Sequence, residues 1–327
     1  MSTTGRRNIA LVLSSGGARG MAHSGVIEAF EQNGFNITSI SGTSMGAVVG
    51  GIYAAGKLTE FNEWASTLDK ADIFKLLDFT FSRQGFIRGE KIFNELRGIV
   101  GNTNIEELQI PFSAIAAELN SRQEVVFTSG CLFEAMRASV SIPTLMQPLL
   151  LQNRILVDGG IVNPVPVNRV QRQPGDLLAV VNVCAAIPCL KPIRQTETAE
   201  QVAERMAERE AYQTKARSFL SKWIKSVPRT DTSTKVYGFL DLLNSSFDLL
   251  QDRLVEMCLE KYQPDILINI SRSTCGTFEF YRANELFEDG KTACEKAIHE
   301  WEQKEQSLSF TGRYNRFMQG LGLQVRS

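Results

Sequence analysis

The chain has 327 residues, 43% of them apolar and 22% charged, and a formal net charge of −1. This composition excludes a fibrous repeat and a disordered chain, and the charge argues against a nucleic-acid binder held by electrostatics. Six scattered cysteines without a C-x-x-C pair, and only two histidines, argue against a structural zinc site. No apolar stretch reaches the length of a signal-peptide core or a membrane span. We therefore expect a reduced, cytoplasmic protein that uses no cofactor and no metal.

The first predicted elements enclose a glycine-rich loop. Ile9 to Leu13 is a continuous apolar run, typical of a strand buried on both faces of a parallel sheet, and it leads into Gly16-Gly17-Ala18-Arg19-Gly20. Met21 to Asn33 has apolar residues at helical spacing and is closed by Gly34, a natural helix C-terminal cap. With a second strand at Ile37 to Ile40, this pattern predicts a right-handed βαβ unit whose two loops leave the same edge of the sheet.

The second strand ends in Gly42-Thr43-Ser44-Met45-Gly46. A serine between two glycines after a strand is typical of a nucleophile elbow, where a sharp strand-to-helix turn leaves the hydroxyl clear. Gly42 and Gly46 carry no side chains that would collide across that turn. The small-residue segment that follows predicts a helix, whose positively polarised N-terminus favours a developing negative charge at Ser44.

The remaining elements alternate between helix and strand. Ile73 to Phe81 is an apolar connection that favours ordinary packing over part of a lid. A hairpin, Leu149 to Val157, delivers Asp158 at its end. We expect helices at Leu58 to Leu68, Gly89 to Val100, Cys131 to Ser139, Glu197 to Arg229, Phe239 to Tyr262 and Ala283 to Glu302, and further strands at Pro111 to Leu119, Glu124 to Thr128, Leu177 to Val183 and Ile266 to Ile270.

This alternation continues almost to the C-terminus without a linker-like stretch. The sequence therefore predicts a single α/β hydrolytic domain over residues 1–304, with an inserted helical region at 190–262. Residues 305–327 are expected to form a loosely held C-terminal tail.

A serine hydroxyl needs a neighbouring base to become a good nucleophile. His299 lies mid-helix between charged neighbours, where a solvated histidine is expected, and His23 is expected to be a structural residue that lines the glycine loop. Asp158 is the best remaining base for Ser44, because the strand before it can bury the carboxylate and raise its proton affinity.

The oxyanion formed when Ser44 attacks an acyl carbonyl requires fixed amide donors. The amides of Gly16, Gly17 and Ala18 suit this role. A phosphate-binding loop is the alternative, but the chain contains neither G-x-G-x-x-G nor the Walker A pattern. Arg19 is expected to hold the loop in place rather than to attract an anionic head group.

Three ordered motifs resemble the patatin-like phospholipase family, in particular its bacterial members. They are Gly16 to Gly20, Gly42 to Gly46, and Asp158-Gly159-Gly160, and Ala138 to Pro143 with Pro148 is similar to the segment ahead of the family's aspartate. The resemblance covers about Asn8 to Val183. It implies a three-layer α/β/α fold with a mostly parallel central sheet, a Ser-Asp dyad without histidine, an oxyanion hole in the first glycine loop, and metal-independent hydrolysis of acyl-ester lipids.

The sequence thus predicts a serine lipid acyl hydrolase of the phospholipase A, lysophospholipase or carboxylesterase type, with Ser44 as nucleophile and Asp158 as general base. Two alternatives stay open: an acyltransferase that uses the same acyl-enzyme, and a non-catalytic regulatory protein that binds lipid. The expected partner is a phospholipid or another acyl-ester lipid. Head group, chain length and oligomeric state are not specified by the sequence.

Residues 211–230 combine five basic and no acidic side chains with an apolar stripe at helical spacing. Such a helix either packs its stripe on the core, which the sequence favours, or lies in an anionic membrane interface. In the second case the protein is peripheral on the inner membrane surface. The basic tail from Thr311 offers a second contact with the same surface.

Overall fold

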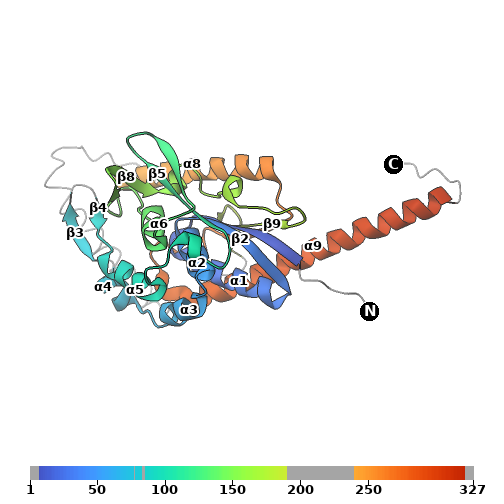
Figure 1. The fold of residues 1–327 in the computed structure, drawn as a ribbon, viewed down its shortest axis with the longest axis horizontal. Helices are drawn as coiled ribbons and strands as arrows, with labels where there is room; N and C mark the ends of the chain where they lie inside the picture. The colour runs from blue at the N-terminus through green and yellow to red at the C-terminus, as the bar shows by residue number, and fades with distance from the viewer. Residues whose placement is uncertain (1–6, 77, 83–84, 190–238, 321–327) are drawn as a thin grey trace, which may run out of the picture. The chain divides into compact units, whose positions relative to one another are not determined.

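A mostly parallel sheet carries the fold (Figure 1). Its strands follow the order β10-β9-β1-β2-β5-β8-β7, and β6 pairs with β5. The pairs from β10 to β5 are parallel, whereas β8 and β6 run antiparallel to β5 and β7 runs antiparallel to β8. The strands are β1 (Arg7–Leu13), β2 (Phe35–Thr43), β5 (Phe112–Glu118), β6 (Gln123–Phe127), β7 (Leu149–Leu151), β8 (Arg154–Asp158), β9 (Leu177–Ala185) and β10 (Ile266–Ser271).

The computed structural model describes residues 7–76, 78–82, 85–189 and 239–320. Residues up to 188 and from 247 onward belong to one unit, and residues 189–246 to another. Every contact discussed below lies within the first unit. The predicted helix Glu197 to Arg229, with its basic segment 211–230, lies outside the described residues, as does most of the predicted insertion. The prediction of a single domain with this insertion and a C-terminal tail therefore stays a prediction.

Helices cover both faces of the sheet. They are α1 (Ala22–Gln32), α2 (Met45–Ala54), α3 (Leu58–Ser66), α4 (Lys70–Leu76), α5 (Glu90–Val100), α6 (Leu132–Ser139), α8 (Phe239–Tyr262) and α9 (Ala283–Gly320). Side chains alternate along a strand, so Leu11 and Leu13 face the core shared with α1, α2 and α9, while Val12 faces Val255 and Leu259 of α8. The predicted three-layer α/β/α arrangement with a mostly parallel sheet is confirmed.

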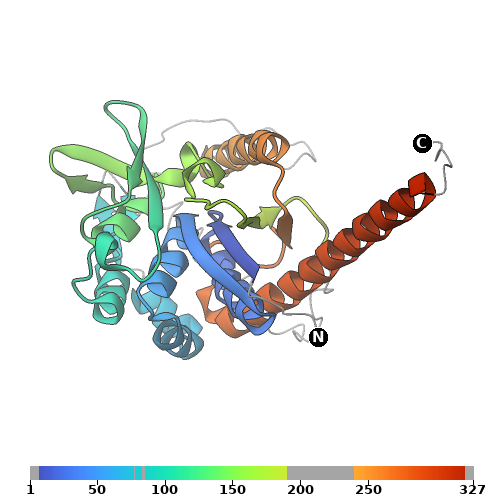
Figure 2. The same cartoon turned by 45° about the vertical axis from the view of Figure 1, so that its right-hand side comes forward.

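Glycines let α1 and α9 cross closely on their side of the sheet (Figure 2). A Cβ on Gly25 would lie 1.9 Å from the carbonyl oxygen of Phe287, and one on Gly290 would lie 2.0 Å from that of Ala22. Each helix therefore presents a glycine where the other helix's backbone passes. Among the described helices, none has the length and apolar character needed to cross a membrane.

Two stretches differ from the sequence-based expectation. Residues Ile73 to Phe81 take in the end of α4 and the start of β3 (Phe79–Ser82), which pairs with β4 (Gly85–Ile87). Asp69 and Asp72 each accept a hydrogen bond from the other's amide, which caps α4, and Ile73 packs in the core.

The last helix also extends further than predicted. The predicted end of this helix is Glu302, but α9 continues to Gly320. Between these residues there is no proline and only one internal glycine, Gly312, so little opposes continuation of the helix.

Candidate active site

Ser44 lies at the N-terminal cap of α2, directly after β2, in a strained backbone conformation. Its φ is 56° and its ψ is −126°, a region that non-glycine residues rarely adopt. A Cβ on Gly42 would lie 2.3 Å from the Gly46 carbonyl oxygen, and one on Gly46 would lie 2.2 Å from that of Leu13. Glycine is therefore required at both positions for the turn to close.

Strand β5 brings Ser44 and Asp158 together although 114 residues separate them. Ile115 pairs with Thr43 of β2 on one edge of β5, and Ala116 pairs with Asp158 of β8. Strand β6 pairs along residues 114–118 of β5, so β2 and β8 must share the opposite edge. The C-terminal ends of β2 and β8 consequently face each other along this edge of β5, with Ser44 and Asp158 where they meet.

The two side chains form a short hydrogen bond. The Oγ of Ser44 donates to the Oδ2 of Asp158 at 2.6 Å, and the Gly160 amide donates to the Oδ1 of Asp158 at 2.7 Å. Ser44 is 3% and Asp158 5% exposed. A Cβ on Gly159 would lie 2.3 Å from the Ile115 carbonyl oxygen, so glycine lets the chain after Asp158 pass close to β5.

Burial makes Asp158 a better proton acceptor than an ordinary aspartate. Desolvation of the carboxylate raises its pKa from 3.8 to about 6, against the smaller lowering by the hydrogen bonds from Ser44 and Gly160. A carboxylate with this pKa is ionised at neutral pH and still has appreciable affinity for the serine proton.

The glycine loop borders this pair. A Cβ on Gly160 would lie 3.4 Å from the Cβ of Ser15, the residue directly before the loop. Among the predicted donors, the Ala18 amide already donates to the Thr277 carbonyl at 2.9 Å. This correction removes Ala18 from the candidate oxyanion hole. The amides of Gly16 and Gly17 stay the predicted donors.

Three further residues support the glycine loop through contacts with neighbouring segments: Arg19, Gly20 and His23. The Nη1 of Arg19 donates to the carbonyls of Cys275 at 2.9 Å and Arg272 at 3.3 Å. The Nε2 of His23 lies 2.9 Å from the Ser14 carbonyl, which can only accept, so this nitrogen carries the proton. Complete burial lowers the pKa of His23 to about 4, so the ring is neutral. A Cβ on Gly20 would lie 2.4 Å from the Cβ of Met45, so glycine lets the loop approach the elbow.

His299 does not join the pair. It is exposed on α9, and its Nε2 lies 2.8 Å from the Nε2 of Gln303. In the described part of the chain, no group of three or more histidine, cysteine, aspartate or glutamate side chains is arranged to hold a metal ion.

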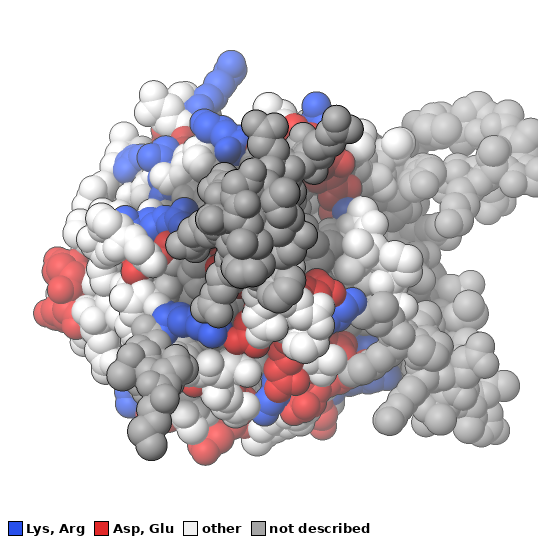
Figure 3. Space-filling model, turned by 90° about the vertical axis from the view of Figure 1, so that its right-hand side faces the viewer, with Lys and Arg blue, Asp and Glu red and all other residues white. Residues whose placement is uncertain are grey.

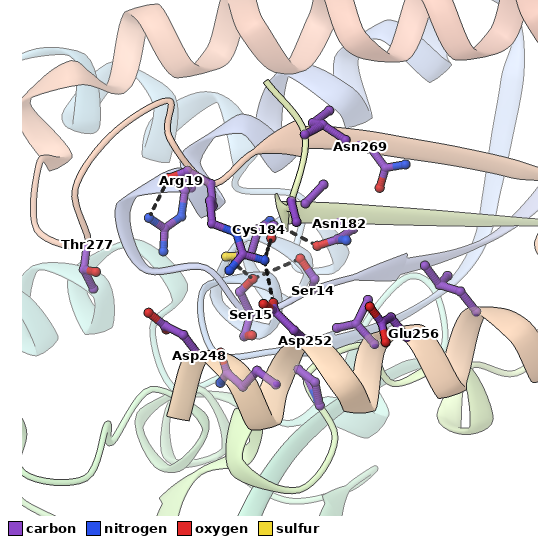
Figure 4. Close-up of a pocket in the computed structure, with 18 residues that line it drawn as sticks. Ser14, Ser15, Arg19, Asn182, Cys184, Asp248, Asp252, Glu256, Asn269 and Thr277 are labelled. Carbon is purple, nitrogen blue, oxygen red and sulfur yellow. Dashed lines mark hydrogen bonds and ion pairs between the residues drawn. The ribbon is translucent and has the colours of Figure 1, made fainter. Parts of the chain in front are cut away.

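A cavity of about 410 Å³ lies beside the glycine loop, at the carboxyl ends of β1, β9 and β10 (Figure 4). Arg19 lines it from the loop, Ser15 from the position directly before the loop, and Asp248 and Asp252 from α8. The carboxyl ends of parallel strands are where open α/β sheets bind ligands. The cavity therefore offers room for a ligand beside the glycine loop, although neither Ser44 nor Asp158 is among the residues that line it.

Sequence reasoning missed two residues that touch this site. Ser139 accepts a hydrogen bond from the Ser44 amide at 2.8 Å, and Gln251 of α8 donates to the Gly160 carbonyl at 3.0 Å. Ser139 lies within the family-like segment Ala138 to Pro143, which is the one sequence signal that could have drawn attention to it. No sequence pattern identifies Gln251.

Comparisons with known proteins agree with the early motifs. The family model described as patatin-like phospholipase matches residues 11–170. An uncharacterized NTE family protein of Mycobacterium tuberculosis is 35% identical over 333 aligned residues, which cover 90% of this chain and 92% of that protein. The lysophospholipase NTE1 of Yarrowia lipolytica is 30% identical over 183 residues, which cover 54% of this chain and 12% of that protein.

The chain therefore belongs to the patatin-like phospholipase family, and its relatives include NTE family proteins of mycobacteria. Among solved structures, VipD from Legionella pneumophila has a TM-score of 0.38 and 14% sequence identity, covering 97% of this chain and 77% of that one.

Proposed function

We propose that this protein is a serine acyl hydrolase that cleaves acyl esters of lipids through a covalent acyl-enzyme. The observation that carries the proposal is the 2.6 Å hydrogen bond from the Ser44 hydroxyl to the buried Asp158 carboxylate, made by a serine in a strained elbow. A nucleophile within hydrogen-bond reach of a base is the arrangement that acyl transfer needs.

In the acylation step, the Oγ of Ser44 attacks the ester carbonyl carbon and its proton passes to the Oδ2 of Asp158. The carbonyl oxygen becomes an oxyanion that accepts hydrogen bonds from the amides of Gly16 and Gly17. As the tetrahedral intermediate collapses, the bond to the leaving alcohol breaks, and the alcohol oxygen takes the proton from Asp158.

In the deacylation step, a water molecule attacks the acyl carbonyl and gives its proton to Asp158. The bond between the Ser44 Oγ and the acyl carbon then breaks, the Oγ recovers the proton, and the fatty acid leaves. Because Asp158 returns the proton to the Ser44 Oγ, each cycle ends with a neutral serine hydroxyl and an ionised Asp158, ready for the next substrate.

Family membership and the similarity to a lysophospholipase support a lipid ester as the substrate. Phosphatidylcholine and lysophosphatidylcholine are therefore suitable probe substrates. With either, we expect Ser44→Ala to lower fatty-acid release by at least about 10³-fold, because the variant has no nucleophile.

His299→Ala is the control, because His299 is exposed and makes no contact with Ser44 among the described residues. It should release fatty acid at the wild-type rate. A folded Ser44→Ala with wild-type turnover would make Ser44 structural. An inactive His299→Ala with unchanged thermal stability would point instead to a serine-histidine mechanism.

A further inference from the structure

The Ser139 hydroxyl is hydrogen bonded on both sides. Its Oγ accepts from the Ser44 amide at 2.8 Å and donates to the Ile115 carbonyl of β5 at 2.5 Å. Ser139 is 0% exposed, so water cannot replace either bond. The Ser139 hydroxyl therefore links the backbone of Ser44 to strand β5 by hydrogen bonds.

The same short segment also holds the base. The Asp158 amide donates to the Ser141 carbonyl at 2.9 Å. The Nη1 of Arg137, one helical turn before, donates to the Ser141 Oγ at 2.6 Å and fixes that residue. Residues 139–141, at the C-terminal end of α6, thus contact the backbone of both Ser44 and Asp158.

We propose that Ser139 is a positioning residue, which holds the Ser44 backbone so that its Oγ stays within hydrogen-bond distance of Asp158. This inference rests on the proposed function. Ser139 touches no reacting atom in this account, and acts only through the Ser44 amide.

Loss of the Ser139 hydroxyl would leave the buried Ser44 amide without a partner, which favours relaxation of the strained elbow. A small displacement of a nucleophile is enough to slow the reaction by about a hundredfold. The Ser44 hydrogen bond also lowers the pKa of Asp158, so a weakened bond raises that pKa further. A general loss of stability would not change the pH dependence in this way.

The experiment compares Ser139→Ala with Ser113→Ala. Ser113 is also a buried serine, and its Oγ lies within hydrogen-bond distance of the Ser41 Oγ, at 2.8 Å, and of the Arg169 carbonyl, at 3.2 Å, without contacting Ser44 or Asp158. Both variants lose one buried hydroxyl. The rate of Ser44 modification by a fluorophosphonate probe is measured from pH 5 to pH 8, together with thermal unfolding and KM for lysophosphatidylcholine.

We expect Ser139→Ala to react with the probe at least about tenfold more slowly than Ser113→Ala. Its KM for lysophosphatidylcholine should change little, and the pH midpoint of its labelling should move upward. Ser113→Ala should keep the wild-type midpoint. If Ser139→Ala is not recovered folded, Ser139→Cys replaces it. A thiol is a weak and longer-range acceptor, so labelling should still fall several-fold.

The proposal would be overturned if folded Ser139→Ala, or folded Ser139→Cys in its place, had the same labelling rate and the same pH midpoint of labelling as the wild type. It would also be overturned if Ser139→Ala and Ser113→Ala lost labelling rate to the same extent and neither shifted the pH midpoint of labelling. In both cases Ser44 is still labelled in the wild type, so the proposed function stands. An absence of Ser44 labelling in the wild type would overturn both proposals.

Discussion

Asp158 is a buried carboxylate whose ionisation opposes folding. Its pKa is raised from 3.8 to about 6 by desolvation. A raised folded-state pKa means that the folded chain binds this proton more tightly than the unfolded chain, so stability falls as pH rises from about 4 to about 6. At neutral pH the charged Asp158 therefore destabilises the protein that uses it.

We predict that Asp158→Asn loses at least about 10³-fold in turnover, yet is more stable than the wild type at pH 7. An amide cannot accept the serine proton, but it removes the buried charge and can still hydrogen bond to Ser44 and Gly160. The gain should be about 2–3 kcal/mol at pH 7 and should vanish near pH 4. Thermal unfolding at the two pH values measures it.

Asp176→Asn is the matched control for this prediction. Asp176 is 3% exposed and accepts hydrogen bonds from the Thr38 hydroxyl and the Gln173 amide, but it lies outside the proposed site. This variant should be active and no more stable than the wild type at pH 7. Equal or lower stability of Asp158→Asn at pH 7 would contradict the account of Asp158 as a destabilising charge.

At the scale of elements, the glycine loop and the elbow lie at one edge of the sheet because β1 and β2 are adjacent and parallel. Gly17, with φ +56°, sits in this loop against Thr277, so a Cβ at this position would lie 2.7 Å from the Thr277 Cγ2 and 2.8 Å from its carbonyl oxygen. A side chain here would press against Thr277 and shift the loop whose amides are the proposed oxyanion donors.

We predict that Gly17→Ala lowers kcat by about a hundredfold while KM changes little, because an oxyanion donor acts mainly in the transition state. Gly34→Ala is the control: Gly34 also has a positive φ, of +75°, but no atom lies within 4 Å of its Cβ position. It should lose stability and keep turnover. A Gly17→Ala variant with raised KM and normal kcat would instead assign the loop to substrate binding.

Local patterns in the sequence predicted the strands, the first helices and the identity of the candidate residues, because apolar runs and glycines report directly on buried strands and tight turns. The pairing of Ser44 with Asp158 was predicted from residue types and motifs, but the way in which β5 aligns the ends of β2 and β8 could not be, since it depends on the register of strands far apart in the chain. For the same reason nothing local showed that Thr277 already engages the Ala18 amide.

At the scale of the whole molecule, acidic and basic side chains are interspersed over the described part of the face in Figure 3. This distribution matches a formal net charge of −1. A lipid surface would therefore be recognised by a local segment rather than by the overall charge. The basic, apolar stretch 211–230 is the segment that the sequence offers, and its membrane contact stays a prediction.

If residues 211–230 bind an anionic interface, the wild type should sediment with phosphatidylserine-containing vesicles at low salt and less so at moderate salt. A Lys222→Glu/Lys225→Glu variant should sediment less. Lys296→Glu/Lys304→Glu, which makes the same charge change at exposed positions of α9, should behave as the wild type does. Identical sedimentation of all three proteins would remove this segment from the account.

Ser44 is proposed as the nucleophile and Asp158 as its base. Incubation with a fluorophosphonate probe, followed by peptide mapping of the adduct, tests this proposal most directly. We expect a single phosphonylated residue, Ser44, with a labelling rate that rises with pH through about 6 as Asp158 ionises and that falls sharply in Asp158→Asn. Labelling of a different residue, or labelling of Ser44 that is unaffected by Asp158→Asn, would contradict it.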